Sequence, residues 1–430
     1  MAAKIALIIL DGIADRPYRE LGGKTPLEAA STPALDAFAA RGANGLYHAV
    51  SPGVACPSEL AHWRIFGYEV DEFPGRGAVE AMGFDVPFGP HEVCLLANLA
   101  AAREEKGALW VVKPRVPLPE AVWAEAFRRV SFFEARGLRL RLHRTTGPDA
   151  ILVLEAPASP RVTDADTCRR GQPVATIRPR AEAEGDEAAR RTADFLNDYL
   201  RWTYRTLADL PGRRPGERLT FICQRAGQRR RIAPFSHRFG MRGATVSSGA
   251  IYRGIAMTIG WTVASAPSLE EPGEELRERL LRAERLFEDH DFVHIHTKAA
   301  DEAAHTREPR LKVEAIEALD RGCGEILARW AEREDRVTVV TADHATPSQG
   351  LLVHSGEEVP LAVTGLRVPQ DSVCSFGEGP AALGRLGHLR GGDLMALLLN
   401  FADRAELLGL RSTPDPLPYF PGPIEPLRVD

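Results

Sequence analysis

Three strand-like runs, each followed closely by carboxylate or histidine side chains, constrain the fold of this 430-residue chain most strongly. The first, Ile5–Leu10, is continuously apolar, as expected of a strand buried on both faces in a parallel sheet. Phe292–His296 and Val337–Thr341 repeat the pattern, with a helical stretch over about residues 310–333 between them. Strand, helix and strand at this spacing predict a βαβ crossover. We therefore expect all three strands to end at one edge of one sheet.

The middle of the chain follows a different pattern. Residues 88–212 alternate short apolar runs with Pro and Gly, and include an alternating strand over 138–144 and an amphipathic helix over 187–205. A chain of this length, 44% hydrophobic, ordinarily forms more than one domain. We expect residues 1–87 and 213–430 to form an α/β core, with a mostly parallel sheet flanked by helices. Residues 88–212 would form an inserted α+β cap that binds substrate.

Charge and cysteine content narrow the function classes. A net charge of -5 argues against a nucleic-acid binder, which usually carries a basic face. The basic run Arg225–Arg231 is the exception, and a phosphate-facing loop or a solvated surface explains it equally well. Six scattered Cys without a C-x-x-C pair predict reduced thiols in a cytoplasmic protein. No apolar run is long enough for a membrane span, so no membrane partner is expected. The oligomeric state is not predicted.

Side chains of the types that bind metals gather at the predicted strand ends. They are Asp11, Asp301, His305, Asp343, His344 and His354. Asp301 and His305 are four residues apart, so one helical turn would place both on one face. Zn and Mn accept imidazole and carboxylate ligands together. Each motif alone has an ordinary explanation, such as a solvated surface pair, a turn or a helix cap, and it is their conjunction that favours a metal site.

Ser58, in the segment PSELAH, supplies a hydroxyl near these motifs in the predicted core. A serine hydroxyl is a weak nucleophile until metal coordination or a base activates it. Two metal ions about 4 Å apart can both activate such an oxygen and neutralise a phosphate. His62, in the same segment, fits either a core histidine or a residue that supports the metal ligands. The combination predicts phosphoryl transfer.

These segments, taken in order, resemble the archaeal-type branch of the cofactor-independent phosphoglycerate mutase family, within the alkaline phosphatase superfamily. The matching segments are LDGIADRP, GGKTPLEAASTPALD, SPGVACPSELAH, FGYEVDEFPGRGAVEAMG, DFVHIHTKAADEAAH, TADHATPSQG and HSGEEVPLAV. They span most of the predicted core, and the resemblance is much thinner through the cap.

The resemblance implies an alkaline-phosphatase-like core and a phosphoserine that forms on Ser58 and passes its phosphoryl group between 2- and 3-phosphoglycerate. It implies two divalent ions, Mn, Zn or Co, with Mg as an alternative. One ion would be held by Asp301, His305 and His354, and the other by Asp11, Ser58, Asp343 and His344. Arg76, Lys298 and Arg225 would contact the substrate, a small phosphorylated metabolite.

The cap departs from the family pattern at several positions. Leu96 stands where the family's F-R-x-N segment has Arg, although Asn98 is kept, and Cys168 stands where D-P-H has His. The family's Asp-Arg-Arg stretch is not evident, and Lys113–Arg115 matches it poorly. A hydrolase, phosphotransferase or phosphomutase acting on another small phosphorylated or phosphonylated metabolite therefore stays open beside the mutase. A non-catalytic metal-binding protein is disfavoured, because all seven candidate ligand positions hold suitable residues.

Overall fold

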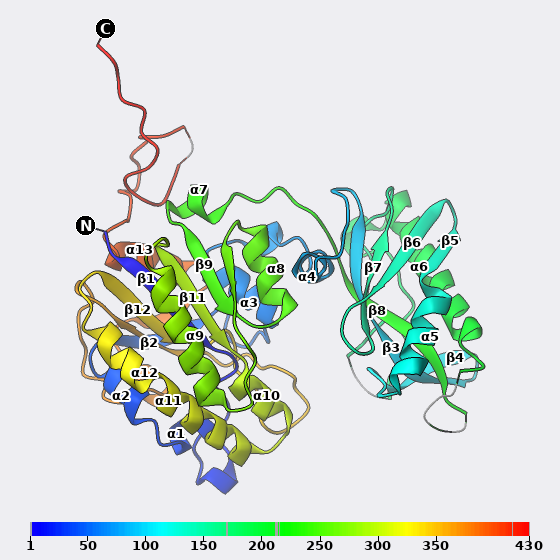
Figure 1. The fold of residues 1–430 in the computed structure, drawn as a ribbon, viewed down its shortest axis with the longest axis horizontal. Coiled ribbons are helices and arrows are strands. Elements are labelled where there is room, and N and C mark those ends of the chain that lie inside the picture. The colour runs from blue at the N-terminus through cyan, green and yellow to red at the C-terminus, as the bar shows by residue number, and fades with distance from the viewer. Residues whose placement is uncertain (1, 169–170, 211–213, 215, 415, 430) are drawn as a thin grey trace. The chain divides into compact units, whose positions relative to one another are not determined.

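The computed structural model describes residues 2–168, 171–210, 214, 216–414 and 416–429. The chain forms two compact units, Met1–Phe73 with Ile232–Asp430 and Pro74–Arg231 (Figure 1). We call them the first and the second unit. The inserted unit is longer than the expected 88–212, because α4 (Arg76–Gly83) packs on β3 (Val93–Glu105) and β8 (Arg218–Gln228), and β8 pairs with β3. The expected boundary at 212–213 lies outside the described residues.

The first unit is an α/β fold built on one sheet, whose strand order is β10-β9-β11-β1-β12-β13-β2-β14. Its strands are β1 (Lys4–Leu10), β2 (Ala43–His48), β9 (Gly243–Ser247), β10 (Thr262–Ser265), β11 (Phe292–Thr297), β12 (Arg336–Thr341), β13 (Val359–Thr364) and β14 (Gly387–Arg390). Among these strands β13 alone runs against its neighbours, so the predicted mostly parallel sheet is confirmed. The apolar run of β1 is buried on both faces, as its composition predicts.

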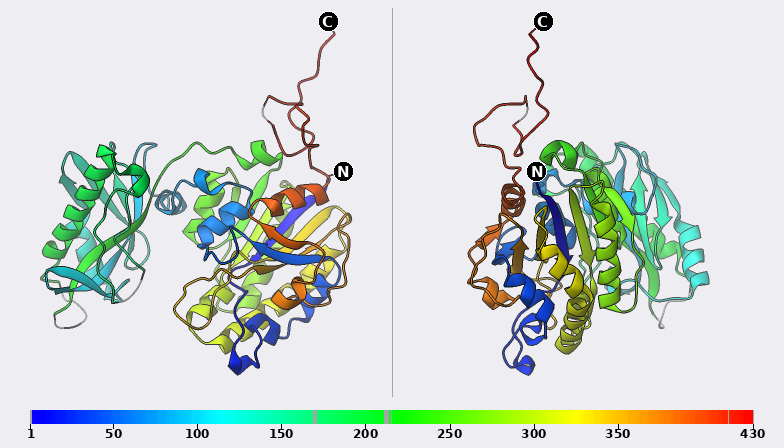
Figure 2. Two further views of the ribbon diagram at one scale, coloured as in Figure 1. Left: turned by 180° about the vertical axis from the view of Figure 1, so that it is seen from behind. Right: turned by 60° about the vertical axis from the view of Figure 1, so that its left-hand side comes forward.

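The helices of the first unit flank this sheet (Figures 1 and 2). They are η1 (Arg19–Leu21), α1 (Pro26–Ala29), α2 (Pro33–Ala39), α3 (Ser58–Ile65), η2 (Val70–Glu72), α7 (Phe235–Phe239), α8 (Ala250–Thr258), α9 (Pro272–Leu286), α10 (Ala299–His305), α11 (Pro309–Ala331), α12 (Glu378–Ala381) and α13 (Asp393–Phe401). α11 packs against α9, α2 and α10, and α9 also covers β11. The segment after α13, red in Figure 2, contains no further helix or strand among its described residues.

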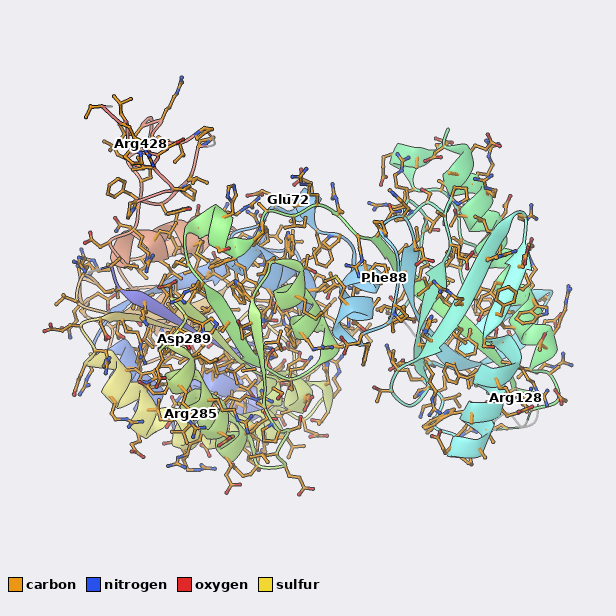
Figure 3. The ribbon with its side chains drawn as sticks, turned by 45° about the horizontal axis from the view of Figure 1, so that its top comes forward. Glu72, Phe88, Arg128, Arg285, Asp289 and Arg428 are labelled. Carbon is orange, nitrogen blue, oxygen red and sulfur yellow. The ribbon has the colours of Figure 1, made fainter. Side chains whose placement is uncertain are left out.

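The second unit is an α+β fold around an antiparallel sheet of order β4-β3-β7-β6-β5, with β8 also paired to β3. Its elements are α4 (Arg76–Gly83), β3 (Val93–Glu105), β4 (Ala108–Lys113), α5 (Glu120–Val130), β5 (Phe132–Ala135), β6 (Leu138–Arg144), β7 (Asp149–Leu154), η3 (Ala181–Ala183), α6 (Glu187–Thr206) and β8 (Arg218–Gln228). The main core packs one sheet face against α5 and α6. Phe88, labelled in Figure 3, belongs to a smaller core with α4, and the Arg229 guanidinium lies 4.3 Å from its ring centroid.

Two further observations concern the whole described chain. All six Cys are free thiols, as the sequence predicts. No helix in the described ranges is both long enough and apolar enough to cross a membrane.

Candidate active site

The strand register of the first unit explains why distant motifs meet. Leu10 of β1 pairs with Thr297 of β11, and Ile9 pairs with Thr341 of β12. All three strands are parallel, so the residues that follow them emerge side by side at one sheet edge, where ligands gather in open α/β sheets. β1 lies between β11 and β12, so the predicted crossover spans one intervening strand. The predicted convergence of the three strand ends is confirmed.

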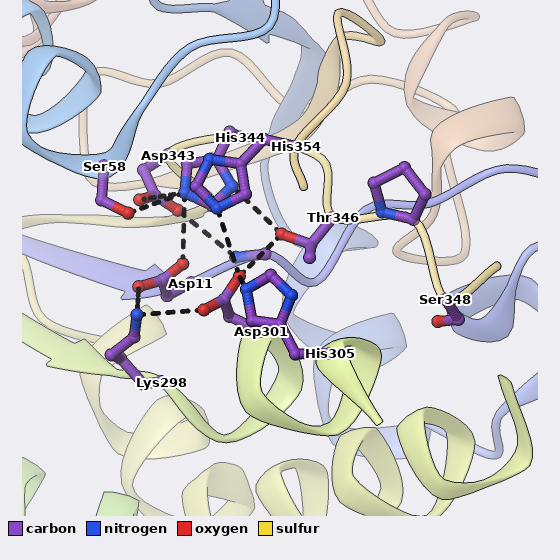
Figure 4. A network of polar contacts seen from close by, with 12 residues as sticks. Asp11, Ser58, Lys298, Asp301, His305, Asp343, His344, Thr346, Ser348 and His354 are labelled. Atoms are coloured by element: carbon purple, nitrogen blue, oxygen red, sulfur yellow. Dashed lines mark hydrogen bonds and ion pairs between the residues drawn. The ribbon is translucent and has the colours of Figure 1, made fainter. Parts of the chain in front are cut away.

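Two overlapping groups of potential metal ligands lie at this edge (Figure 4). In each group the ligand atoms all lie within 4.8 Å of one another, and the groups are Asp301, His344 and His354, and Asp11, Asp343 and His344. His344 belongs to both groups, and its ring stacks on that of His354 with centroids 3.7 Å apart. Carboxylate oxygens and imidazole nitrogens at this spacing suit a divalent transition-metal ion.

His305 lies at the edge of the first group. It ends α10, one turn after Asp301, and its Nε2 is 3.3 Å from Asp301 Oδ1. The predicted D-x-x-x-H therefore does form one helical turn. The His305 side chain is 37% exposed and remains outside both groups as the structure defines them, so its role as a ligand remains a proposal.

Ser58 is the first residue of α3, and its Oγ lies 2.9 Å from His344 Nε2. His62, one turn later, is fully buried, and burial lowers its pKa to about 4. Neutral His62 donates from Nδ1 to the Ser58 carbonyl at 2.8 Å and so fixes the turn that carries the hydroxyl. This contact favours the supporting role for His62 that the sequence left open.

The electrostatics of the edge favour added positive charge. Burial and the nearby charge of Asp11 raise the pKa of Asp343. The pKa of His344 rises to about 9, because Asp343, Asp11 and Asp301 outweigh the effect of burial. Asp11 Oδ1 and Asp343 Oδ2 are buried, and apart from His344 Nε2, at 3.5 and 3.1 Å, no donor among the described residues makes a hydrogen bond to them. Buried carboxylate oxygens of this kind are costly unless paired or bound to a cation, so the donor set fits metal ions.

Lys298 lies against the carboxylates of the site. Its Nζ is 3.0 Å from Asp301 Oδ2 and 3.8 Å from Asp11 Oδ2. Both carboxylates raise the pKa of Lys298 despite burial, so it is charged. The structure shows that the ammonium balances two buried acids, and the predicted contact of Lys298 with substrate stays a proposal.

Comparison with known proteins agrees with this geometry. The Metalloenzyme superfamily model matches residues 3–401. The 2,3-bisphosphoglycerate-independent phosphoglycerate mutase of Methanopyrus kandleri is 36% identical over 94% of this chain and 98% of its own length. This chain belongs to that mutase family. Among solved structures, PH0037 from Pyrococcus horikoshii has a TM-score of 0.75 at 27% identity, covering 95% of this chain and all of its own. The cofactor-independent phosphoglycerate mutase of Thermoplasma acidophilum has a TM-score of 0.61 at 28% identity, covering 93% and 100%.

Two residues that the sequence did not point to hold the carboxylate of Asp11 in place. Tyr252 of α8 donates its hydroxyl to Asp11 Oδ2 at 2.8 Å, and His296 Nε2 lies 3.0 Å from the same oxygen. Both side chains are buried. They leave Asp11 Oδ1 directed at the metal-ligand group. The alternation in the FVHIH segment points His294 and His296 to one face, which was the available signal for His296, whereas Tyr252 has no such motif.

Arg76 and Arg225, the other predicted substrate contacts of this family member, belong to the second unit. Arg76 begins α4 and pairs with Glu80 at 2.6 Å. Arg225 of β8 has a φ of 57°, and its backbone N–H donates to Asp164 at 2.5 Å. Their contact with substrate remains a proposal.

The second unit also holds a polar cluster on one face of its sheet. Asp166 accepts from Asn98 Nδ2 at 3.4 Å, from Gln224 Nε2 at 3.3 Å and from the Cys168 backbone at 2.7 Å. Asn98 Oδ1 in turn accepts the backbone N–H of Arg115 at 3.2 Å. Cys168, which stands at the family's His position, is thus part of this cluster.

Proposed function

We propose that this chain is a metal-dependent phosphoglycerate mutase that interconverts 2- and 3-phosphoglycerate through a phosphoserine on Ser58. The observation that carries the proposal is the 2.9 Å approach of Ser58 Oγ to Nε2 of His344, a residue common to both ligand groups. A nucleophile at this position, in a chain 36% identical to a phosphoglycerate mutase, supports phosphoryl transfer over a purely metal-binding role.

Two divalent ions would complete the site, with Mn, Zn or Co as the expected metals and Mg as an alternative. Their proposed ligands are Asp301, His305 and His354 for one ion, and Asp11, Ser58, Asp343 and His344 for the other. When bound, the ions supply positive charge that stabilises the transferring phosphoryl group and activates the serine hydroxyl.

The chain's own groups do the positioning. Ser58 opens α3, and the amino end of a helix favours an anion, so a phosphoryl group on Ser58 lies where the helix dipole stabilises it. Lys298 offers a fixed cation beside the same edge. In this proposal, Arg76 and Arg225 of the second unit bind the carboxylate or phosphate of the substrate, because a guanidinium binds either in a bidentate manner. The second unit then acts as the substrate-binding cap of a cytoplasmic enzyme.

The test combines one substitution with two product assays. Metal-loaded parent, Ser58→Ala and the exposed control Ser236→Ala receive 3-phosphoglycerate, and 2-phosphoglycerate and free phosphate are both measured. The parent and the control should form 2-phosphoglycerate without releasing phosphate, and acid-quenched parent should carry phosphate on Ser58. Ser58→Ala should form neither product, because no other hydroxyl replaces the attacking oxygen. Full mutase activity in Ser58→Ala would refute the covalent route.

A second candidate is transfer to water or to another small hydroxy compound. It is favoured by Leu96, which packs with Ile151 and Val153 in an apolar cluster rather than presenting the family's guanidinium. Release of free phosphate in the same assay, or faster turnover of another phosphorylated or phosphonylated compound in a substrate panel, would establish this alternative.

A further inference from the structure

Thr346, two residues after His344, lies beside Asp301 and His344 (Figure 4). Its side chain is fully buried. Its Oγ1 donates to Asp301 Oδ1 at 2.9 Å and lies 3.1 Å from His344 Nδ1. One hydroxyl therefore contacts a ligand found in only one group and the ligand that the two groups share.

The number of hydrogens on this hydroxyl fixes the direction of both bonds. A threonine hydroxyl has one hydrogen to donate, and an ionised carboxylate can only accept. Asp301 is the acceptor here, because its carboxylate also lies 3.0 Å from Lys298 Nζ and 3.3 Å from His305 Nε2. The hydroxyl hydrogen therefore goes to Asp301, so the 3.1 Å contact with His344 is a bond in which Nδ1 donates. Nδ1 then carries a hydrogen whether the ring is charged or neutral, and Nε2 is the nitrogen whose hydrogen a metal ion would displace.

The atoms around His344 Nε2 agree with that assignment. Nε2 is the nitrogen that faces Ser58 Oγ at 2.9 Å, Asp343 Oδ2 at 3.1 Å and Asp11 Oδ1 at 3.5 Å. The other tautomer would direct a lone pair at Thr346 and leave Nε2 unable to bind a cation. In metal sites, the hydrogen bond of the second ring nitrogen commonly sets tautomer and orientation in this way.

The backbone holds the hydroxyl in place. The Thr346 N–H donates to Ala14 O at 3.0 Å, and Lys312 Nζ donates to Thr346 O at 2.8 Å. Gly12, with φ of 66°, leaves the space that the hydroxyl needs, because a Cβ there would lie 2.5 Å from Thr346 Oγ1. The Asp11-Gly12 pair is thus a ligand followed by the residue that lets Thr346 approach.

We propose that Thr346 is a positioning residue that sets the tautomer of His344 and the orientation of Asp301, and so couples the two metal sites. This inference rests on the proposed two-metal function. Its prediction for Thr346→Val, which keeps the shape and removes the hydroxyl, is weaker binding of zinc by about 10- to 100-fold, as is typical when a supporting hydrogen bond to a metal ligand is lost. Thr346→Ser, which keeps the hydroxyl, should bind zinc within about threefold of the parent.

The test is a calorimetric zinc titration of metal-free parent, Thr346→Val, Thr346→Ser and a matched control. Thr338→Val is that control, because Thr338 is also buried and its hydroxyl has no hydrogen-bond partner among the described residues. Loss of affinity in Thr346→Val, with parental affinity in the control, supports the inference. Parental affinity and stoichiometry in Thr346→Val overturn it while leaving the proposed function intact. A parent that takes up none of zinc, manganese, cobalt and magnesium in parallel titrations overturns both.

Nitrogen-15 spectra of the zinc-loaded parent give a second readout that does not depend on any variant. We expect the His344 ring to carry its hydrogen on Nδ1 and to bind zinc through Nε2. A hydrogen on Nε2 in the loaded parent would overturn the inference even if Thr346→Val fails to fold.

Discussion

Replacement of Lys312 by Met should strongly destabilise the first unit. Lys312 is fully buried on α11, and its Nζ lies 2.9 Å from Ala14 O, 2.8 Å from Thr346 O and 3.1 Å from Asp15 Oδ2. These acceptors come from the loops that follow β1 and β12, which carry Asp11, Asp343 and His344. Lys312 therefore joins two ligand-bearing loops to the helix that follows α10.

The magnitude follows from what Met leaves behind. Met fills most of the aliphatic volume, so the loss is mainly electrostatic. Removal of one partner of a buried ion pair costs about 3–5 kcal/mol, because the other charge stays buried. Asp15 keeps donors from Tyr18 and from Ser348 Oγ, each at 2.6 Å, which moderate that cost. We expect Lys312→Met to lower the free energy of unfolding by about 3 kcal/mol.

Hydrogen exchange of the β1 and β12 amides measures the free energy of unfolding of this unit. Arg310→Met, at an exposed position on the same helix, is the matched control and should change it by less than about 0.5 kcal/mol. The double variant with Asp15→Asn should cost less than Lys312→Met alone, because no charge then stays unpaired. A loss below about 1 kcal/mol in Lys312→Met, or a double variant that costs the sum of both changes, would refute the reasoning.

Three further predictions concern the same unit. Burial raises the pKa of Glu378 to about 7, so between pH 5 and 7 the folded protein holds a proton that the unfolded chain, with a pKa near 4.3, has released. The free energy of unfolding of the parent should therefore fall by about 1–3 kcal/mol, relative to that of Glu378→Gln, as the pH rises from 5 to 8. Unfolding experiments on both proteins at both pH values measure this difference. His305→Ala should lower metal affinity and mutase rate by about 10- to 100-fold, with partial recovery in excess metal, and a parental rate with full metal content would show that His305 is only a surface partner of Asp301. Gly12→Ala should lower zinc affinity, because its Cβ would displace the Thr346 hydroxyl, and unchanged calorimetric binding would contradict the close approach.

The site residues could be predicted from the sequence where a metal-ligating side chain directly follows an apolar strand. Asp11 and Asp343 each follow a run whose apolar composition forces burial, so their place at a sheet edge follows from short segments. The strand order could not be predicted in the same way. That β1 lies between β11 and β12 depends on pairing between residues about 290 and 330 positions apart along the chain, which no local pattern encodes.

The sequence also could not predict that one histidine belongs to both groups of potential metal ligands. Neighbours Asp343 and His344 suggest one site, yet His344 belongs to both groups, and its ring stacks on that of His354 from the same connection between β12 and β13. Tyr252 shows the same limit, since a buried tyrosine on an amphipathic helix looks like core until its hydroxyl is found on Asp11. Supporting contacts of this kind arise from packing in three dimensions.

The second unit shows why a missing motif residue is weaker evidence than a present one. Leu96 and Asn98 are two apart on β3, so both side chains lie on one face of the sheet. Asp149 of β7 pairs directly with Asn98 and shares that face, and the Arg115 guanidinium binds Asp149 at 2.8 Å. Lys113–Arg115 matches the family poorly as a linear motif. The fold nevertheless brings the guanidinium of Arg115 to the sheet face where this chain has Leu96 in place of the family's Arg. A cation is therefore present there, supplied by another segment, and the loss at Leu96 does not by itself exclude a carboxylate-bearing substrate.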